Sequence, residues 1–129
     1  MKKYLIPFLF MLVPLIANAH EMVPTYPKLK PSYMDGLLVT TMEIFNKRKD
    51  VEYYEIAVFD KDWRPIPFVS SFTVVQLDYL KRVKFDIYIR EKDKDKALYV
   101  CSRSKTLQQK VSNTTITSKI CSKFKGAEE

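Results

Sequence analysis

The stretch from Lys81 to Cys101, KRVKFDIYIREKDKDKALYVC, decides the fold of this chain. In its first half, one parity carries valine, phenylalanine and two isoleucines, while the other carries arginine, lysine and aspartate. This two-residue period predicts a β-strand with one buried face and one wet face. The six alternating charges from Glu91 to Lys96 cannot enter a core, so we expect the chain to turn there. Ala97 to Cys101 then predicts a second strand.

Short apolar stretches recur along the rest of the chain, separated by polar turns. The segment 20–35 contains three prolines, which predicts an extended edge strand or a lead-in loop. Further strands are expected at residues 37–47, 51–59, 66–69, 72–77 and 114–124. A helical turn is expected only within Val75 to Leu80. The pattern predicts an all-β chain, an immunoglobulin-like antiparallel β-sandwich of about seven strands in a single domain.

The N-terminus has the features of a secretion signal. Lys2 and Lys3 precede an uncharged apolar run, and Ala17-Asn18-Ala19 places small residues where signal peptidase reads. We therefore expect residues 1–19 to be a signal peptide that is cleaved after Ala19, residues 20–129 to form the domain, and the protein to be periplasmic or secreted. An uncleaved membrane anchor is the alternative. Loss of the two lysines would lower the formal charge from +7 to +5.

The chain has two cysteines, Cys101 and Cys121. An oxidising compartment favours a disulfide between them. Two free thiols or half of a metal site are the alternatives, but a single histidine and the lack of a CxxC motif argue against structural zinc. If Val100 and Ile120 face the core, both cysteines lie on the same outer face of neighbouring strands. The opposite parity, with Cys101 facing inward, remains open.

Asp95 to Cys101 resembles the D-x-A-x-Y-x-C signature of immunoglobulin strand F. The resemblance begins with Asp95 and includes Tyr99, two residues before the cysteine. It implies that Tyr99 stabilises a corner by donating its hydroxyl hydrogen bond to upstream backbone.

Residues 38–60 and the charged hairpin that leads into 97–104 resemble the N-terminal domain of periplasmic pilus-assembly chaperones. That resemblance implies an exported, non-enzymatic accessory or assembly domain that binds another protein of the cell envelope or surface. Pairing through an exposed edge strand is the expected mode of binding. The expected contacts lie on the proline-bearing first segment and on the final strand, at Ile116, Lys119, Ile120 and Lys123.

His20 supports a second hypothesis, a small periplasmic copper-binding protein. A histidine at the mature N-terminus can bind copper through its α-amine and imidazole. This arrangement resembles the copper site of copper-dependent polysaccharide monooxygenases. That site needs a second histidine, however, and His20 is the only one in the chain.

Other chemistry has little support in the sequence. The chain has no G-x-S-x-G motif, no glycine-rich phosphate loop and no histidine base besides His20, so neither catalysis nor a cofactor is expected. Its lysines and arginines are spread along the chain, and export argues against a nucleic-acid partner. Weak attraction to anionic surfaces, such as lipid, an envelope polymer or an acidic protein, is a better use of the basic charge, and a surface that only aids solubility is the alternative.

Overall fold

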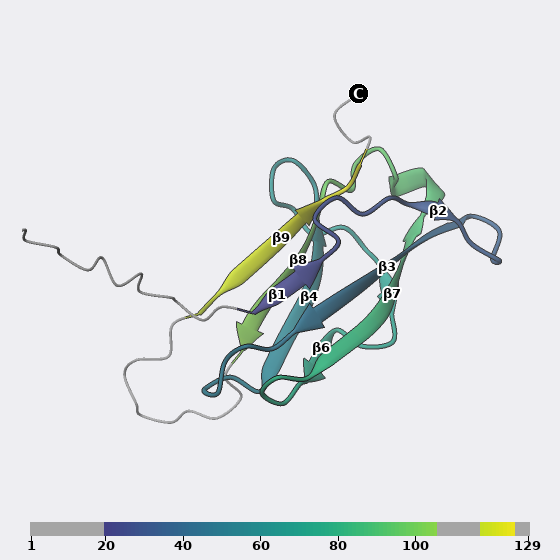
Figure 1. The fold of residues 1–129 in the computed structure, drawn as a ribbon. Helices are drawn as coiled ribbons and strands as arrows, with labels where there is room; N and C mark the ends of the chain where they lie inside the picture. The colour runs from purple at the N-terminus through teal and green to yellow at the C-terminus, as the bar shows by residue number, and fades with distance from the viewer. Residues whose placement is uncertain (1–19, 106–116, 126–129) are drawn as a thin grey trace, which may run out of the picture.

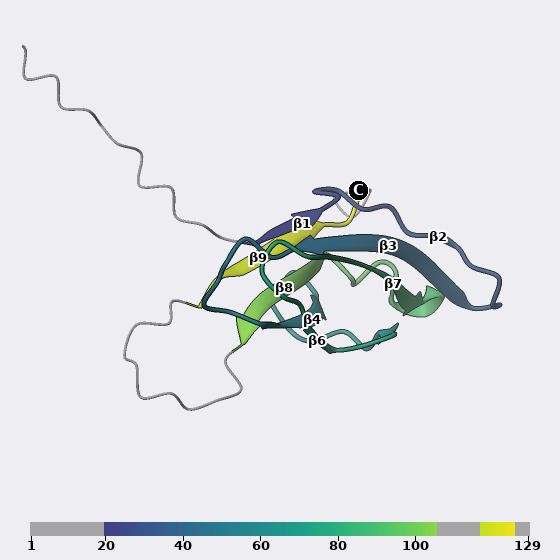
Figure 2. The same ribbon diagram turned by 60° about the horizontal axis from the view of Figure 1, so that its bottom comes forward.

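The computed structural model describes residues 20–105 and 117–125, which form two antiparallel β-sheets packed face to face (Figures 1 and 2). Sheet A contains β1 (Glu21–Val23), β2 (Lys30–Pro31), β3 (Leu37–Phe45), β5 (Val69–Ser70) and β7 (Arg82–Arg90). Sheet B contains β4 (Tyr53–Phe59), β6 (Val74–Gln76), β8 (Tyr99–Lys105) and β9 (Lys119–Lys123). The predicted immunoglobulin-like sandwich is confirmed, with nine strands in the described residues where about seven were expected.

Two of the predicted features fall outside these residues: the signal peptide at 1–19 and the first part of the final strand, including Ile116. Within the described part of the chain, no helix is long and apolar enough to cross a membrane.

The centre of sheet A is the pairing of β3 with β7, which runs unbroken from Leu37 opposite Arg90 to Phe45 opposite Arg82. The apolar parity of both strands points into the sandwich, as the alternation predicted. Its buried side chains are those of Met42, Ile44, Phe85, Ile87 and Ile89. Burial of each such side chain contributes about 1.5–3 kcal/mol, so this pair supplies a large part of the core energy.

Sheet B supplies the other wall of the core. Tyr54, Ile56 and Val58 point inward from β4, and Val100 points inward from β8. On β9, the partly buried Ile120 packs against the same core. The sheet is ordered β6-β4-β8-β9, so β9 is an edge strand.

The first segment switches between the two sheets. Its β1 pairs with β3 of sheet A, from Glu21 to Val23. The chain then leaves β3, and the carbonyls of Thr25 and Pro27 accept hydrogen bonds from the N–H groups of Lys123 (3.1 Å) and Lys125 (2.8 Å) on sheet B. The proline-bearing segment therefore lies at the edge of the sandwich and is hydrogen-bonded to both sheets.

The charged run after β7 contains the helical segment of the described residues, a 3-10 turn at Glu91–Asp93 (η1). The predicted helical turn within Val75 to Leu80 is wrong, because the chain there forms the end of β6 and then a β-turn. Asp93 is buried, and its carboxylate accepts a hydrogen bond from Arg90 Nε at 2.7 Å. Its neighbour Asp95, which belongs to the immunoglobulin signature, is exposed.

Candidate protein-binding edge and its supporting network

The hydrogen-bond pattern shows which side of β9 is open. The N–H of Phe124 donates to the carbonyl of Leu98 at 2.9 Å, and the carbonyl of Ser118 accepts from the N–H of Ser104 at 2.9 Å. Even-numbered residues therefore turn their backbone groups to β8, and odd-numbered residues turn theirs to the other side. On that other side, the N–H groups of Lys123 and Lys125 are already hydrogen-bonded to the first segment, as described above. Lys119–Cys121 at the near end has no strand hydrogen-bonded to it there, within the described part of the sheet.

β1 lies beside this open end without pairing to it, because its own partner is β3 (Figures 1 and 2). The two strands close one side of the sandwich where sheet A meets sheet B. The backbone groups of β9 on this side therefore lie next to β1, a strand of sheet A, but are not paired with it.

The disulfide between Cys101 and Cys121 is confirmed. The two residues are opposite one another in the β8–β9 register, with Cα atoms 4.0 Å apart. They occupy a non-hydrogen-bonded pair, where strands approach most closely. Val100 and Ile120 face the core, so both sulfurs lie on the outer face, as the first of the two parities predicted.

Lys119 crosses this outer face. The backbone of Lys119 is opposite Arg103, which is in turn opposite Glu55 on β4. Its Nζ, however, lies further along sheet B, 4.8 Å from the ring centroids of both Phe59 and Trp63. The rung of the disulfide lies between, so the side chain passes across it. This explains why Cys101 is only 2% exposed although it faces outward. Lys119, expected as a partner contact, thus also has an intramolecular role.

Tyr99 stacks on Trp63, with ring centroids 4.5 Å apart and planes 4° apart. Trp63 has a φ of 62° and is held in a turn in which the Asp60 carboxylate accepts hydrogen bonds from the N–H groups of Asp62 and Arg64. The aromatic contact, rather than a corner hydrogen bond, is the interaction of Tyr99 that the structure describes.

A buried polar network lies under the start of β9. The ring of His20 bonds to two serine hydroxyls, Nε2 to Ser102 Oγ at 2.8 Å and Nδ1 to Ser118 Oγ at 3.0 Å. The ring also packs on Tyr54, with centroids 4.5 Å apart. Burial lowers the pKa of His20 to about 4, and burial raises the pKa of Tyr54 to about 12. Both groups are therefore neutral at physiological pH, and they join β1, β4, β8 and the approach to β9.

The network continues to the turn after β3. Tyr54 donates its hydroxyl hydrogen bond to Asn46 Oδ1 at 2.6 Å, and Arg48 NH1 lies 3.5 Å from Ser118 Oγ. Arg48 also forms an ion pair with Asp50, which holds the pKa of that carboxyl below its ordinary value. Sequence reasoning missed these residues, although a polar Asn46 directly after an apolar strand was a signal for a buried cap.

The geometry does not fit the copper hypothesis. His20 is 1% exposed, and both ring nitrogens are engaged by serine hydroxyls. No group of three or more His, Cys, Asp or Glu side chains gathers for a metal ion in the residues that the structure describes. The arrangement instead anchors the beginning of β1.

A second gap lies along β3, between β1 and β2. β1 covers Glu43 and the residues after it, and β2 covers Leu38 and Val39, so Thr41 lacks a partner strand on this side. A pocket of about 280 Å³ opens at this position and is lined by Val23, Pro24, Thr41, Met42, Glu43 and Lys84.

Comparison with known proteins identifies the class of fold. No protein-family model matches the chain, and no curated protein sequence matches it. Among solved structures, the E. coli chaperone DraB matches 82% of the chain with a TM-score of 0.64 at 20% identity. A chain from the Salmonella enterica complex of the SafA pilin with the SafB chaperone also matches 82%, with a TM-score of 0.63 at 15% identity.

The chain therefore has the immunoglobulin-like fold of pilus-assembly chaperones, as its sequence indicated. It spans about half the length of the two solved chains, 53% and 52% respectively.

Proposed function

We propose that this chain is an exported, non-enzymatic assembly domain that binds another protein of the cell envelope or surface by adding a strand to the open end of β9. The observation that supports this most directly is the edge at Lys119–Cys121, where backbone groups of β9 point away from β8 and no described strand is hydrogen-bonded to them, although β1 lies beside them. Main-chain pairing of this kind gives affinity, and alternate side chains give specificity. The likeness in fold to DraB, and to a structure in which a chaperone is complexed with a pilin, supports the same class of function.

The edge is held in place for such pairing. The disulfide fixes β9 against β8 at the rung of Cys121, and Ile120 packs against the core beneath. A strand that is already ordered loses less conformational entropy on binding than a mobile one.

The gap at Thr41 is less suitable for strand addition. β1 and β2 pair with β3 at both ends of this gap, so a strand added there would be blocked at both ends. On β9 the first segment is hydrogen-bonded only beyond Cys121, at Lys123 and Lys125, so a strand added at Lys119–Cys121 would be blocked at one end only. We therefore favour β9 as the binding edge.

A proline at Lys119 tests the proposal. Lys119→Pro removes an N–H that points away from β8, so the ladder within sheet B keeps its hydrogen bonds while strand addition loses one. Lys119→Ala is the matched control, because it removes the ammonium near Phe59 and Trp63 but keeps the N–H. Covalent capture from envelope extracts should recover a specific partner with wild type and Lys119→Ala, but not with Lys119→Pro.

Circular dichroism must show that Lys119→Pro is folded. A folded Lys119→Pro variant that captures the same partner as wild type would exclude pairing at this edge. Export is tested separately: mass spectrometry of the secreted or periplasmic protein should find a chain that begins at His20.

A further inference from the structure

The turn between β6 and β7 displays two large apolar side chains to solvent. Tyr79 is 41% exposed and Leu80 is 55% exposed. Leu80 also has a φ of 62°, the left-handed region that bulky L-residues rarely adopt. An exposed leucine in a disfavoured backbone conformation needs an explanation.

The backbone around Leu80 is held by the buried turn after β3. The Leu80 N–H donates to the carbonyl of Asn46 at 2.7 Å, and the Asn46 N–H donates to the carbonyl of Lys81 at 3.0 Å. The Lys81 N–H also donates to the backbone carbonyl of Asp78 at 3.0 Å. These hydrogen bonds hold Leu80 in its disfavoured conformation.

Packing does not account for the leucine side chain. Trp63, the other non-glycine residue at positive φ in the described part of the chain, stacks its ring on Tyr99. Leu80 is not one of the hydrophobic side chains that pack on the core. The fold gains little from a leucine at this position, and glycine or asparagine would suit the backbone better.

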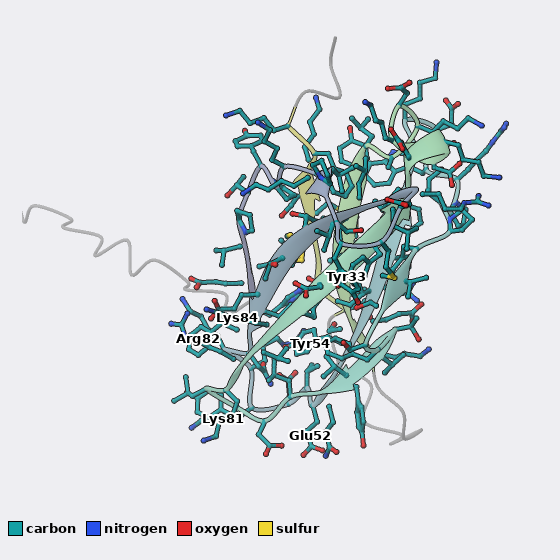
Figure 3. The ribbon with its side chains drawn as sticks, turned by 90° about the vertical axis from the view of Figure 1, so that its right-hand side faces the viewer. Tyr33, Glu52, Tyr54, Lys81, Arg82 and Lys84 are labelled. Carbon is teal, nitrogen blue, oxygen red and sulfur yellow. A yellow bond between two sulfur atoms is a disulfide. The ribbon has the colours of Figure 1, made fainter. Side chains whose placement is uncertain are left out.

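Cations surround this turn. The bonds of Asn46 place Lys81 beside the turn after β3, which carries Lys47 and Lys49, and Arg82 and Lys84 follow along β7 opposite Phe45 and Glu43. Figure 3 shows Lys84, Arg82 and Lys81 along one side of the sandwich, toward the end where Glu52 also lies. Lys49 Nζ lies 5.3 Å from the centroid of the Tyr79 ring.

Some of this charge is neutralised and some is not. Lys47 pairs with Glu21, and Arg82 lies 3.6 Å from Glu43. For Lys49, Lys81 and Lys84, in contrast, the described residues provide no carboxylate within 4.0 Å, although Glu43 lies opposite Lys84 in the β3–β7 register. Asp78 and Glu52 are exposed near the same end and reduce its net charge, so the three lysines must act at short range.

We propose that this turn and its lysines bind the surface of an anionic lipid bilayer, with Leu80 and Tyr79 at the boundary of the acyl chains and the lysines on headgroup phosphates. Tyrosine favours the interfacial region, and lysine stems can lie along an apolar surface while their ammonium groups stay in water. Two exposed side chains are too few for the core of a protein–protein interface, which buries about 800 Å² on each partner. Binding through this turn is independent of strand addition at β9, since it uses other residues.

Co-flotation with lipid vesicles tests this directly. The full mature chain should bind vesicles of phosphatidylcholine and phosphatidylglycerol at low ionic strength, bind pure phosphatidylcholine far more weakly, and dissociate as salt is added. Neutralising Lys49, Lys81 and Lys84 together by glutamine should weaken binding on the order of 100-fold, since each lysine contributes about five-fold. The matched control, glutamine at Lys92, Lys94 and Lys96 around η1, makes the same charge change at the other end of β7 and should have little effect.

Leu80→Asn separates this role from a structural one. Asparagine tolerates positive φ, so the variant should be as stable as wild type toward urea, or more stable, while losing vesicle binding at least five-fold. Vesicle binding equal to wild type in Leu80→Asn, no binding of wild type to anionic vesicles, or an equal loss in the η1 control would each overturn the proposal. Binding to soluble polyphosphate but not to vesicles would also overturn it, in favour of an acidic macromolecule.

Discussion

Asn46 has the most fully used side chain in the buried network. Its Nδ2 donates to the carbonyls of Val51 and Leu77, both at 2.8 Å. Its Oδ1 accepts from the N–H of Arg48 at 2.8 Å and from the hydroxyl of Tyr54 at 2.6 Å. Asn46 is completely buried, and all four hydrogen-bonding positions of its amide are occupied.

Asn46→Ala should therefore destabilise the fold severely. The substitution leaves four buried groups without their partner, and each unsatisfied group costs about 1–3 kcal/mol unless water enters the vacated space. We expect a loss of about 4 kcal/mol in the free energy of unfolding, which is exceptional for one polar side chain. Asn46→Asp should be at least as damaging, because its second oxygen would face the two carbonyls that Nδ2 now serves.

Urea denaturation of the oxidised protein measures both losses. Tyr54→Phe is the control, since it removes a single hydrogen bond and should cost about 1 kcal/mol. In the double variant Asn46→Ala/Tyr54→Phe the two losses should not add, because the residues share a hydrogen bond. A loss below about 1 kcal/mol for Asn46→Ala would refute the reasoning, since it would show that the network contributes little.

Two further predictions concern covalent and ionisable groups. Replacing Cys101 and Cys121 by serine should lower the free energy of unfolding by about 3 kcal/mol, the entropy of closing a loop of this length, and an unchanged urea midpoint would contradict it. Because burial lowers the pKa of His20 from its ordinary 6.5 to about 4, the unfolded chain binds more protons between those two values. The contribution of His20 to the free energy of unfolding should be complete above pH 6.5 and should fall by about 1.4 kcal/mol per pH unit toward pH 4. His20→Gln should remove that slope in urea titrations, and a slope that persists would assign it to other groups.

The fold was predictable because the strongest signals in this chain are local. Alternation from Val83 to Ile89 sets the buried face of β7, and the parity of Val100 and Ile120 places both cysteines on one outer face. A period of two is a property of the strand itself, so it can be read without knowing the partner strand.

The supporting contacts were not predictable, because they join residues that are distant in sequence. His20 meets Ser102 and Ser118 only after three strands have been placed, and Lys119 meets Trp63 only across the disulfide. A histidine at a presumed chain end and a lysine on an edge strand suggest ligands and partners when only the sequence is known. Their burial and contacts depend on tertiary packing, which periodicity does not report.

The first segment has a mechanical consequence. Residues 21–23 are bonded to sheet A, and Thr25 and Pro27 are bonded to sheet B. Two sheets that are held together by side chains alone can slide over one another with only gradual loss of contact. Here, sliding would stretch backbone hydrogen bonds at both ends of a segment only a few residues long, so the sandwich should resist shear most strongly along the side where β1 and β9 meet.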